Sequence, residues 1–450
     1  MPEILYIATY KHFDSMLESE IKSLLLGHQS FFQDSSNLVP RTSFSGQERN
    51  EKGNEITVIS GPLHAGKTSL LKQIASDLQG VKIYIDFEDN RLKEQGSEIF
   101  QVIEDTVAEI YEKESESNDS GQIYYFLDEI QNVPGWDIWV DRLNRQGAGI
   151  FVTSSRASLT EQELSSRLAG RSKILKLFPF SFEEYLLIKY SVIPKPNSIT
   201  PSLSDEILCA FLQYFENGGF PDVIKTGNVK LCQKYFEEIL QKGVTAGYDI
   251  LDINALKKLA VFLISNMACE NSLDTLETVS GVENEETVHR YLNYLEDNFL
   301  LYRVPKLNYL PDSKEKTDTP HKVYATDTGF FKAVYPNYPD SLGLRFENLV
   351  LLELLRREKQ LFYFRNKKEC DFLIKEENSQ KVSDAIQASI HLGSQAVRER
   401  EILGLMEAME EYGLEEGLIL TLDDEEVLKI EGKDGMKKIV VKPVWKWMLE

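Results

Sequence analysis

The sequence predicts an α/β fold whose first half is a parallel β-sheet covered by helices. Four short apolar runs, at residues 55–60, 81–87, 122–129 and 148–155, alternate with stretches of helical spacing. Strands that alternate with helices form parallel sheets, and continuous apolar runs fit strands that are buried on both faces. From about residue 341 the pattern becomes helix, strands, helix, strand and short helix, which predicts a second α/β domain.

The 450 residues correspond to about three domains at roughly 150 residues per domain. Two polar segments divide the pattern: 191–206 is rich in Pro and Ser, and 310–321 reads "LPDSKEKTDTPH". Helical spacing dominates between them. We therefore expect an N-terminal helix and loop at 1–50, the parallel-sheet core at 51–190, a mainly helical region at 191–320 and the second α/β domain at 321–450.

The composition excludes several classes of protein. No run of about 18 apolar residues occurs, so the sequence predicts no membrane-spanning helix. The start "MPEILYIATYKHFDS" lacks the features of a secretory signal, and the four cysteines are too scattered for a zinc site or a disulfide framework. We expect a cytoplasmic protein. The net charge of −22 argues against broad, non-specific binding to a phosphate backbone, although a local basic patch stays open.

Residues 61–68, "GPLHAGKT", fit the pattern G-x-x-x-x-G-K-[ST] between a predicted strand and a predicted helix. In such a loop backbone N–H groups turn towards the phosphates, Lys67 reaches the β- and γ-phosphates, and the Thr68 hydroxyl group ligates Mg²⁺. The alternative is an ordinary glycine-rich turn. We expect the loop to bind ATP with Mg²⁺. The residues expected to contact the nucleotide and its cation are Gly61, Pro62, Leu63, His64, Ala65, Gly66, Lys67, Thr68, Ser69 and Asp128.

The run "IYYFLDE" ends in two acids, Asp128 and Glu129. An acid at the end of a buried strand completes a P-loop site. Asp128 is predicted to hold the Mg²⁺ together with Thr68, and Glu129 is predicted to orient the attacking water. A solvated strand end is the alternative interpretation of this pair.

Further polar side chains follow the next predicted strand. It ends in "FVTSS", so Thr153, Ser154 or Ser155 could bond the γ-phosphate or the water. Downstream, "SSRLAGRS" offers Arg167 and Arg171, and an arginine on the γ-phosphate stabilises charge in the transition state. Surface ion pairing is the alternative for either arginine. The predicted catalytic residues are Lys67, Glu129, Ser155 and Arg171.

Several stretches carry a family resemblance: "GPLHAGKTSLL", "YYFLDEIQNVPGW", "IFVTSSRAS", "LSSRLAGRSKILKLFPFSFEEYL", "FENGGFPDV", "VHRYLNYLEDNFLLYRVP", "KVYATDTGF" and "RFENLVLLELLRR". From about residue 50 the chain resembles the AAA+-type P-loop ATPases of bacteria and archaea with an attached DUF4143 domain. The resemblance implies an AAA_14-like core, a winged-helix region and a C-terminal domain like a restriction endonuclease. Leu63 and His64 stand where the family usually has two arginines.

The segment 272–304 reads as helix, turn, helix and strand, which fits the winged helix that the resemblance implies. DNA binding would place its second helix in a major groove. Five acids in or beside that helix oppose this, against only His289 and Arg290: Glu283, Glu285, Glu286, Glu296 and Asp297. We favour a packing module that links the core to the C-terminal domain. A local basic cluster is interpreted as a solvated face: Lys306, Lys314, Lys316 and Lys322.

The stretches "RFENLVLLELL", "YFRNKKECDFLI" and "DAIQASI" resemble the PD-(D/E)XK nuclease fold. Active members bind Mg²⁺ through a helix Glu, a strand Asp and a Glu-x-Lys on the next strand. Glu347 and Asp371 match the first two, but Gln387 and Ser389 stand at the third. Gln387 is a neutral, weaker Mg²⁺ ligand, and Ser389 supplies no cationic amine. We therefore predict a vestigial site in a binding or structural domain, without nuclease activity.

The sequence thus predicts a Mg²⁺-dependent ATP-binding protein and ATPase whose nucleotide state moves the C-terminal domain. Two alternatives stay open: a nucleotide-gated binding module with little or no turnover, and an ATP-driven enzyme of nucleic acids. The partners expected are ATP and an unidentified protein. The oligomeric state, and whether Arg171 acts on its own subunit or on a neighbour, stay undecided.

Overall fold

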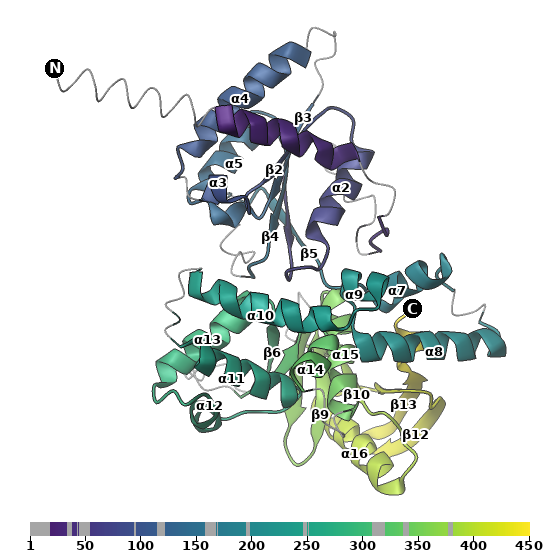
Figure 1. Cartoon of the computed structure of the whole chain (residues 1–450). Helices are drawn as coiled ribbons and strands as arrows, with labels where there is room; N and C mark the ends of the chain where they lie inside the picture. The colour runs from purple at the N-terminus through teal and green to yellow at the C-terminus, as the bar shows by residue number, and fades with distance from the viewer. Residues whose placement is uncertain are drawn as a thin grey trace, which may run out of the picture. The chain divides into compact units, whose positions relative to one another are not determined.

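The computed structural model describes residues 19–33, 38–42, 44, 55–93, 96–114, 122–157, 168, 170–194, 199–245, 250, 252–307, 320–335, 342–376 and 381–450. The chain divides into two compact units (Figure 1), of which the first contains Met1–Gly61 and Gly66–Leu177 and the second Pro62–Ala65 and Phe178–Glu450. In the N-terminal segment, where the sequence predicts a helix, residues 19–28 are helical, and residues 1–18 lie outside the described part.

The first unit is built on a five-stranded sheet of strand order β2-β3-β4-β1-β5, in which neighbouring strands pair in parallel. The strands are β1 (Ile56–Ser60), β2 (Val81–Asp86), β3 (Ile123–Asp128), β4 (Gly149–Ser154) and β5 (Ser172–Lys176). The four predicted apolar runs are the first four strands, so the predicted parallel-sheet core is confirmed. The fifth strand, β5, has intermediate or exposed positions throughout and gives no continuous apolar signal.

Helices cover both faces of this sheet (Figure 1). The helical elements are η1 (Gln29–Gln33), α2 (Lys67–Asp77), α3 (Asn90–Lys93), α4 (Ile99–Glu114), η3 (Ile130–Asn132) and α5 (Trp136–Arg145). On one face Val58 and Val152 pack in a cluster with Trp139 of α5, whose ring stacks on Phe100 of α4 at 4.5 Å between centroids. Alternating side chains of the strands thus bury both faces, as expected for a parallel sheet.

The second unit begins with helices and a two-stranded antiparallel sheet. These elements are α7 (Phe182–Tyr190), α8 (Pro201–Asn217), α9 (Pro221–Thr226), α10 (Lys230–Thr245), α11 (Ile253–Ser265), α12 (Leu273–Ser280), α13 (Glu285–Asp297), β6 (Leu301–Pro305) and β7 (His321–Ala325). Local signals fix several helix starts. Ser181 and Glu184 form a capping box at α7, and the Asn284 side chain accepts a hydrogen bond from Glu286 N at the start of α13.

The rest of the second unit is a mixed six-stranded sheet with flanking helices, in the order β12-β13-β11-β10-β9-β8. Its elements are α14 (Gly329–Val334), α15 (Leu342–Arg356), β8 (Gln360–Arg365), β9 (Glu369–Lys375), β10 (Val382–Ala388), α16 (Gln395–Glu411), β11 (Glu416–Thr421), β12 (Glu426–Gly432), β13 (Gly435–Pro443) and α17 (Val444–Trp447). The central pairs β10–β11 and β11–β13 are parallel, whereas β8–β9, β9–β10 and β12–β13 are antiparallel. The predicted second α/β region is therefore present.

Buried polar contacts join the helical part of the second unit to its C-terminal part. Asp327 accepts hydrogen bonds from Gly219 N and Gly329 N, and Arg356 of α15 donates to the carbonyl oxygens of Pro179 and Phe180. These contacts lie within the compact unit that contains Phe178–Glu450. They help explain why residues 178–450 pack as one unit.

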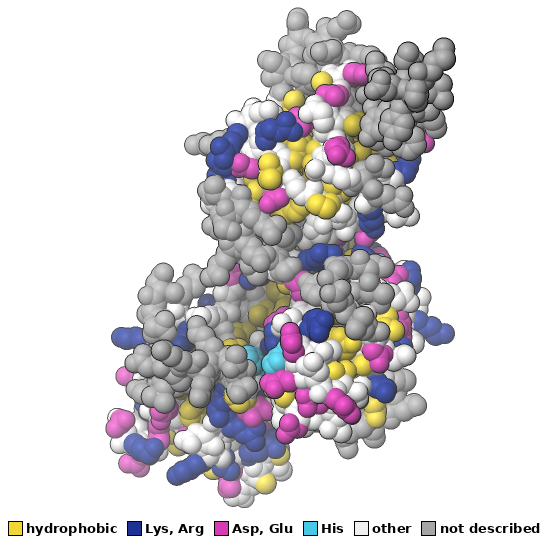
Figure 2. Space-filling view, turned by 90° about the vertical axis from the view of Figure 1, so that its left-hand side faces the viewer, with side chains coloured by type: hydrophobic (Ala, Val, Ile, Leu, Met, Phe, Trp, Pro, Cys, Tyr) yellow, Lys and Arg dark blue, Asp and Glu magenta, His cyan; other side chains and the backbone are white. Residues whose placement is uncertain are grey.

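Within the described part of the chain, no helix is both long and apolar enough to cross a bilayer. Figure 2 shows acidic and basic side chains interspersed over the face that it presents. The net charge of −22 is therefore not gathered into one acidic field on that face.

Candidate functional site

Two glycines shape the loop between β1 and α2. Gly66 precedes α2 with φ 98°, a left-handed conformation that glycine adopts without strain. A Cβ atom on Gly61 would lie 2.0 Å from the carbonyl oxygen of Leu177, so only glycine fits there. The N-terminus of α2 follows directly, and the N–H groups of a first helical turn have no partner within the helix. A glycine loop of this shape before a helix N-terminus can bind a phosphate.

Asp128, the last residue of β3, lies at the centre of a hydrogen-bonded group. Its Oδ2 accepts from the Thr68 hydroxyl group at 2.7 Å and from the Tyr84 hydroxyl group at 2.9 Å, and its Oδ1 accepts from the Thr153 hydroxyl group. Burial, and then the neighbouring charge of Glu129, raise the pKa of Asp128 to about 6. A bound cation would offset the cost of burying the charged Asp128 carboxylate, and hydroxyl and carboxylate oxygens are ligands that Mg²⁺ prefers. Thr68 and Asp128 therefore fit the predicted cation site.

Glu129 is held in a single orientation beside Asp128. Its backbone has φ 50°, which is strained for a residue other than glycine and is found most often at functional sites. Its N–H group donates to Thr153 Oγ1 at 2.9 Å. Its Oε2 accepts from Ser155 Oγ at 2.7 Å, from Ser155 N at 3.1 Å and from Gln131 Nε2 at 2.6 Å. The carboxylate is positioned by three donors.

Lys67 joins this group to the loop. Its Nζ donates to the carbonyl oxygen of Gly61 at 3.0 Å and lies 3.1 Å from Oε1 of Glu129. Both side chains of the ion pair are less than a tenth exposed. The first unit thus brings together Gly61, Lys67, Thr68, Asp128, Glu129 and Ser155, all at the carboxyl ends of β1, β3 and β4.

Pro62, Leu63, His64 and Ala65, which the sequence also assigns to the phosphate loop, belong to the second unit. There His64 stacks on Tyr235 of α10 at 3.8 Å between centroids, and its Nε2 lies 2.6 Å from Glu238 Oε2. Ser69, in the first turn of α2, is half-buried.

Arg171, which the sequence offers either to its own subunit or to a neighbour, does not lie at this site within its own chain. Ser172 at the start of β5 pairs with Ile56 at the start of β1, so Arg171 lies at the amino ends of the strands. The phosphate loop follows their carboxyl ends. The Arg171 guanidinium pairs with Asp141 of α5 instead. Arg167 lies outside the described residues.

Three residues of the first unit were missed by sequence reasoning. Tyr84 lies inside the apolar run of β2, and Gln131 follows the two acids. Neither residue belongs to a sequence pattern that would mark it as part of the site. Arg156 directly follows "FVTSS", which is a usable signal. Its N–H group donates to Ser154 Oγ at 3.1 Å, and its carbonyl oxygen accepts from Ser60 Oγ at 3.3 Å. Arg156 therefore lies where β1 passes into the phosphate loop.

The second unit brings the predicted vestigial nuclease residues together. Glu347 on α15 and Asp371 on β9 both lie beside the ammonium group of Lys322, at 2.8 Å and 3.4 Å. Gln387 on β10 accepts from Asp371 N at 3.2 Å and donates to Glu401 at 2.5 Å. The interpretation of Lys322 as part of a solvated basic face is wrong, because Lys322 is 1% exposed. Lys314 and Lys316 lie outside the described residues.

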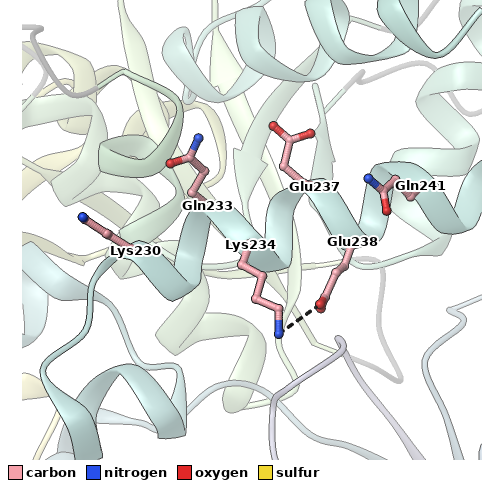
Figure 3. Close-up of a pocket in the computed structure, with 6 residues that line it drawn as sticks. All are labelled: Lys230, Gln233, Lys234, Glu237, Glu238 and Gln241. Atoms are coloured by element: carbon pink, nitrogen blue, oxygen red, sulfur yellow. Dashed lines mark ion pairs between the residues drawn. The ribbon is translucent and has the colours of Figure 1, made fainter.

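A further hollow, of about 490 Å³, runs along α10 (Figure 3). All its lining side chains come from that helix: Lys230, Gln233, Lys234, Glu237, Glu238 and Gln241. Lys234 and Glu238 form an ion pair of 3.4 Å one turn apart, and Lys257 pairs with Glu237. Pairs of this kind belong to an ordinary solvated helix face, and we assign no chemistry to this hollow.

Comparison with known proteins identifies the family to which the chain belongs. An uncharacterized protein of Methanocaldococcus jannaschii, MJ1544, is 31% identical over 412 residues, which cover 88% of each chain. The chain belongs to the family of this archaeal protein. An uncharacterized protein of Haemophilus influenzae is 28% identical over 318 residues, which cover 67% of this chain and 74% of that protein.

Two family models match different parts of the chain. The model described as an AAA domain (AAA_14) matches residues 53–186, which contain the phosphate loop, Asp128, Glu129 and Ser155. The AAA_14-like core is thus confirmed, and the first unit carries an AAA domain of the P-loop ATPase type. A domain of unknown function, DUF8612, matches residues 209–344. The expected DUF4143 domain is not confirmed, and the winged-helix and nuclease-like interpretations stay predictions.

Solved structures give weaker likenesses. The Walker-type ATPase PABY2304 of Pyrococcus abyssi matches with 14% identity and a TM-score of 0.41, over 68% of this chain and 99% of that chain. The RuvB Holliday junction branch migration motor of Thermotoga maritima matches with 20% identity and a TM-score of 0.29, over 56% and 82%. Scores this low carry no argument about function.

Proposed function

We propose that the chain is a Mg²⁺-dependent ATPase. The observation that carries the proposal is the hydrogen-bonded group at the carboxyl edge of the sheet, in which Lys67, Thr68, Asp128 and Glu129 are held in contact. A phosphate cradle, two oxygen ligands for a cation and an oriented carboxylate are the parts that phosphoryl transfer to water requires.

Each side chain has a role that follows from its contacts. Lys67 would bind the β- and γ-phosphates, for which it has to leave Glu129. Thr68 and Asp128 would hold Mg²⁺, which supplies positive charge to the phosphate oxygens. Glu129, fixed by Ser155 and Gln131, would then accept a hydrogen bond from the attacking water and orient it.

Turnover of ATP by the purified chain tests this proposal. We expect phosphate release in Mg²⁺, none in EDTA, and loss of turnover in Lys67→Ala through loss of nucleotide binding. Glu129→Gln should lose turnover and keep ATP. Turnover that survives in Lys67→Ala would show a contaminating enzyme and remove the support for an ATPase.

We further propose that nucleotide state changes the C-terminal region, since the order of the domains joins an ATPase core to a separate α/β part. Limited proteolysis within 191–206 and 310–321 tests the coupling. Cleavage rates should differ between ATP-bound Glu129→Gln and nucleotide-free protein. Equal rates in both states would remove the coupling and leave the ATPase standing.

A second candidate function is a nucleotide-gated binding module that switches its affinity for a protein partner. The observation that favours it is the place of Arg171, which pairs with Asp141 away from the site. Without an arginine on the γ-phosphate, hydrolysis is expected to be slow. Tight ATP binding with no turnover in the wild-type chain would select this function.

A further inference from the structure

A tyrosine from the neighbouring strand contacts the carboxylate of Asp128. Tyr84 on β2 pairs with Phe126 on β3, so Tyr84, Phe126 and Asp128 share one face of the sheet. An aromatic side chain is long enough to reach its diagonal neighbour across a strand pair, and the Tyr84 hydroxyl group donates to Asp128 Oδ2 at 2.9 Å. The same oxygen accepts from the Thr68 hydroxyl group at 2.7 Å. Tyr84 therefore contacts the oxygen that Thr68 also contacts.

Three hydroxyl groups fix the direction of the Asp128 carboxylate. Thr68 and Tyr84 donate to Oδ2, and Thr153 donates to Oδ1. A carboxylate has about four acceptor positions, so these three hydrogen bonds occupy most of them. The carboxylate can rotate only if at least one of the hydrogen bonds breaks. Each of the three donors therefore helps to decide where the charge of Asp128 points.

The ring of Tyr84 is itself covered by the N-terminal segment. Phe31 of η1 stacks on Tyr84, with the ring centroids 3.5 Å apart and the ring planes 4° apart. Phe32 packs edge-on against the rings of Tyr84 and Phe126, at 6.4 Å and 5.6 Å between centroids. Tyr84 and Asp128 are 6% and 4% exposed, so the hydrogen bond between them is shielded from water. A hydrogen bond in such surroundings is stronger than one in water.

The same N-terminal segment is attached to α2, the helix that follows the phosphate loop. The Nζ atom of Lys72 on α2 lies 4.7 Å from the centroid of the Phe31 ring. Gln73, the next residue of α2, donates through Nε2 to the carbonyl oxygen of Val39 at 2.7 Å and accepts through Oε1 from Arg41 N at 3.3 Å. The segment therefore contacts both β2, which carries the tyrosine, and the helix that begins at the phosphate loop.

We propose that Tyr84 is a positioning residue of the ATP site, and that Phe31, which lies outside the matched AAA domain at residues 53–186, holds Tyr84 in place. The inference rests on the proposed function, because Asp128 is the carboxylate to which that proposal assigns Mg²⁺. The hydrogen-bond partners of a metal-binding group fix its direction, and their loss usually lowers metal affinity about 10- to 100-fold. Tyr84 acts on the nucleotide only through the cation, so its effect disappears when the cation is removed.

Calorimetric titration of the full chain with ATP, once in Mg²⁺ and once in EDTA, tests the proposal without relying on turnover. The quantity compared is the Mg²⁺ enhancement, defined as the Kd of ATP in EDTA divided by its Kd in Mg²⁺. Tyr84→Phe keeps the stacked ring and removes the hydroxyl group. The Mg²⁺ enhancement should therefore fall about tenfold or more, while the Kd in EDTA stays unchanged. Tyr125→Phe is the matched control and should equal the wild type, because Tyr125 is buried on the opposite face of the sheet, against Trp139.

A double-mutant cycle tests whether Phe31 acts through Tyr84. Phe31→Leu keeps an apolar side chain but removes the stacked ring, so the Mg²⁺ enhancement should fall several-fold. Phe31→Tyr keeps the ring and should bind ATP as the wild type does. In the Tyr84→Phe background, Phe31→Leu should cause no further loss, because the hydroxyl group that it positions is already absent. Losses that add in the double variant would make Phe31 an independent packing contact and overturn its part in the proposal.

The same titrations separate this inference from the proposed function. If the wild-type chain binds no ATP, or binds it equally well in Mg²⁺ and in EDTA, the proposed function fails and this inference fails with it. If the wild type shows a Mg²⁺ enhancement that Tyr84→Phe leaves intact, this inference alone is wrong. It is also wrong if Tyr84→Phe weakens ATP binding equally in Mg²⁺ and in EDTA, because Tyr84 would then support the phosphate loop rather than the cation site.

Discussion

The Nζ atom of Lys67 lies 3.1 Å from Oε1 of Glu129, at the carboxyl edge of the parallel sheet. This ion pair connects the group expected to bind phosphate with the group expected to orient water. Both side chains are buried, so the pair is shielded from solvent and each partner constrains the other. In the proposed mechanism a γ-phosphate would compete with Glu129 for Lys67, and that competition would free the carboxylate for water.

Glu129→Gln should therefore separate binding from turnover. The amide has the size of the carboxylate but does not compete for Lys67, so ATP affinity is expected to stay equal or to rise several-fold. Turnover should fall at least about 100-fold, as is usual when an oriented catalytic group is lost. Calorimetric ATP titration and phosphate release measure the two quantities. A parallel loss of ATP binding would assign Glu129 a structural role.

Ser155→Ala should give a smaller loss than Glu129→Gln. The Ser155 hydroxyl group donates to Glu129 Oε2 at 2.7 Å, and the Ser155 N–H group still holds that oxygen when the hydroxyl group is removed. We expect turnover about tenfold lower, with ATP affinity unchanged, because one hydrogen bond to a charged group is lost. Ser154→Ala is the matched control, since the Ser154 hydroxyl group contacts Arg156 rather than Glu129.

The substitutions Arg156→Ala and Arg171→Ala form a second matched comparison. Arg156 follows β4 at the edge that carries the phosphate loop, whereas Arg171 precedes β5 at the opposite edge. Arg156→Ala is expected to lower turnover about 100-fold if its guanidinium reaches the γ-phosphate. Arg171→Ala should leave turnover by the single chain unchanged. A loss that appears only with Arg171→Ala, and only at high protein concentration, would point to an arginine supplied by a neighbouring chain.

Most residues of the candidate ATP site can be located from the sequence because its parts are local. The glycine loop and the two acids after "IYYFL" each sit at a strand end, and parallel strands bring their carboxyl ends to one edge. Where Arg171 lies in its own chain, paired with Asp141 just before β5, was not visible in the sequence, because β5 has no continuous apolar run. Lys322 was misread because its three carboxylate partners lie 25 to 49 residues away in the chain. Only tertiary packing could reveal that it is buried.

Gly404 on α16 should tolerate no side chain. A Cβ atom there would lie 2.1 Å from the carbonyl oxygen of Glu369, which is backbone and cannot move aside. Gly404→Ala is therefore expected to destabilise the second unit by about 2 kcal/mol through overpacking. Gly343 on α15 is the matched control, because its Cβ would meet nothing within 4 Å. Gly343→Ala should be neutral or slightly stabilising, since alanine favours helix. Unfolding midpoints of both variants measure the difference.

The buried carboxylate of Asp327 should make the stability of the second unit depend on pH. Burial raises the pKa of Asp327 to about 6, although the N–H groups of Gly219 and Gly329 favour its charged form. The folded state therefore holds a proton that the unfolded state, with a pKa near 3.9, has already released. This contribution to stability is complete below the unfolded pKa and is lost as the pH rises through about 6.

Between pH 5.5 and pH 7.5 that loss amounts to about 1 kcal/mol. Asp327→Asn removes the titrating group, so its stability deficit relative to the wild type should be larger at pH 5.5 than at pH 7.5. Asn348→Ala provides a destabilising control that does not titrate, because among the described residues the Asn348 side chain bonds the backbone of Ala325 alone. Its deficit should be constant over the same range. Urea unfolding at several pH values measures all three proteins, and a constant deficit in Asp327→Asn would show that Asp327 stays charged when folded.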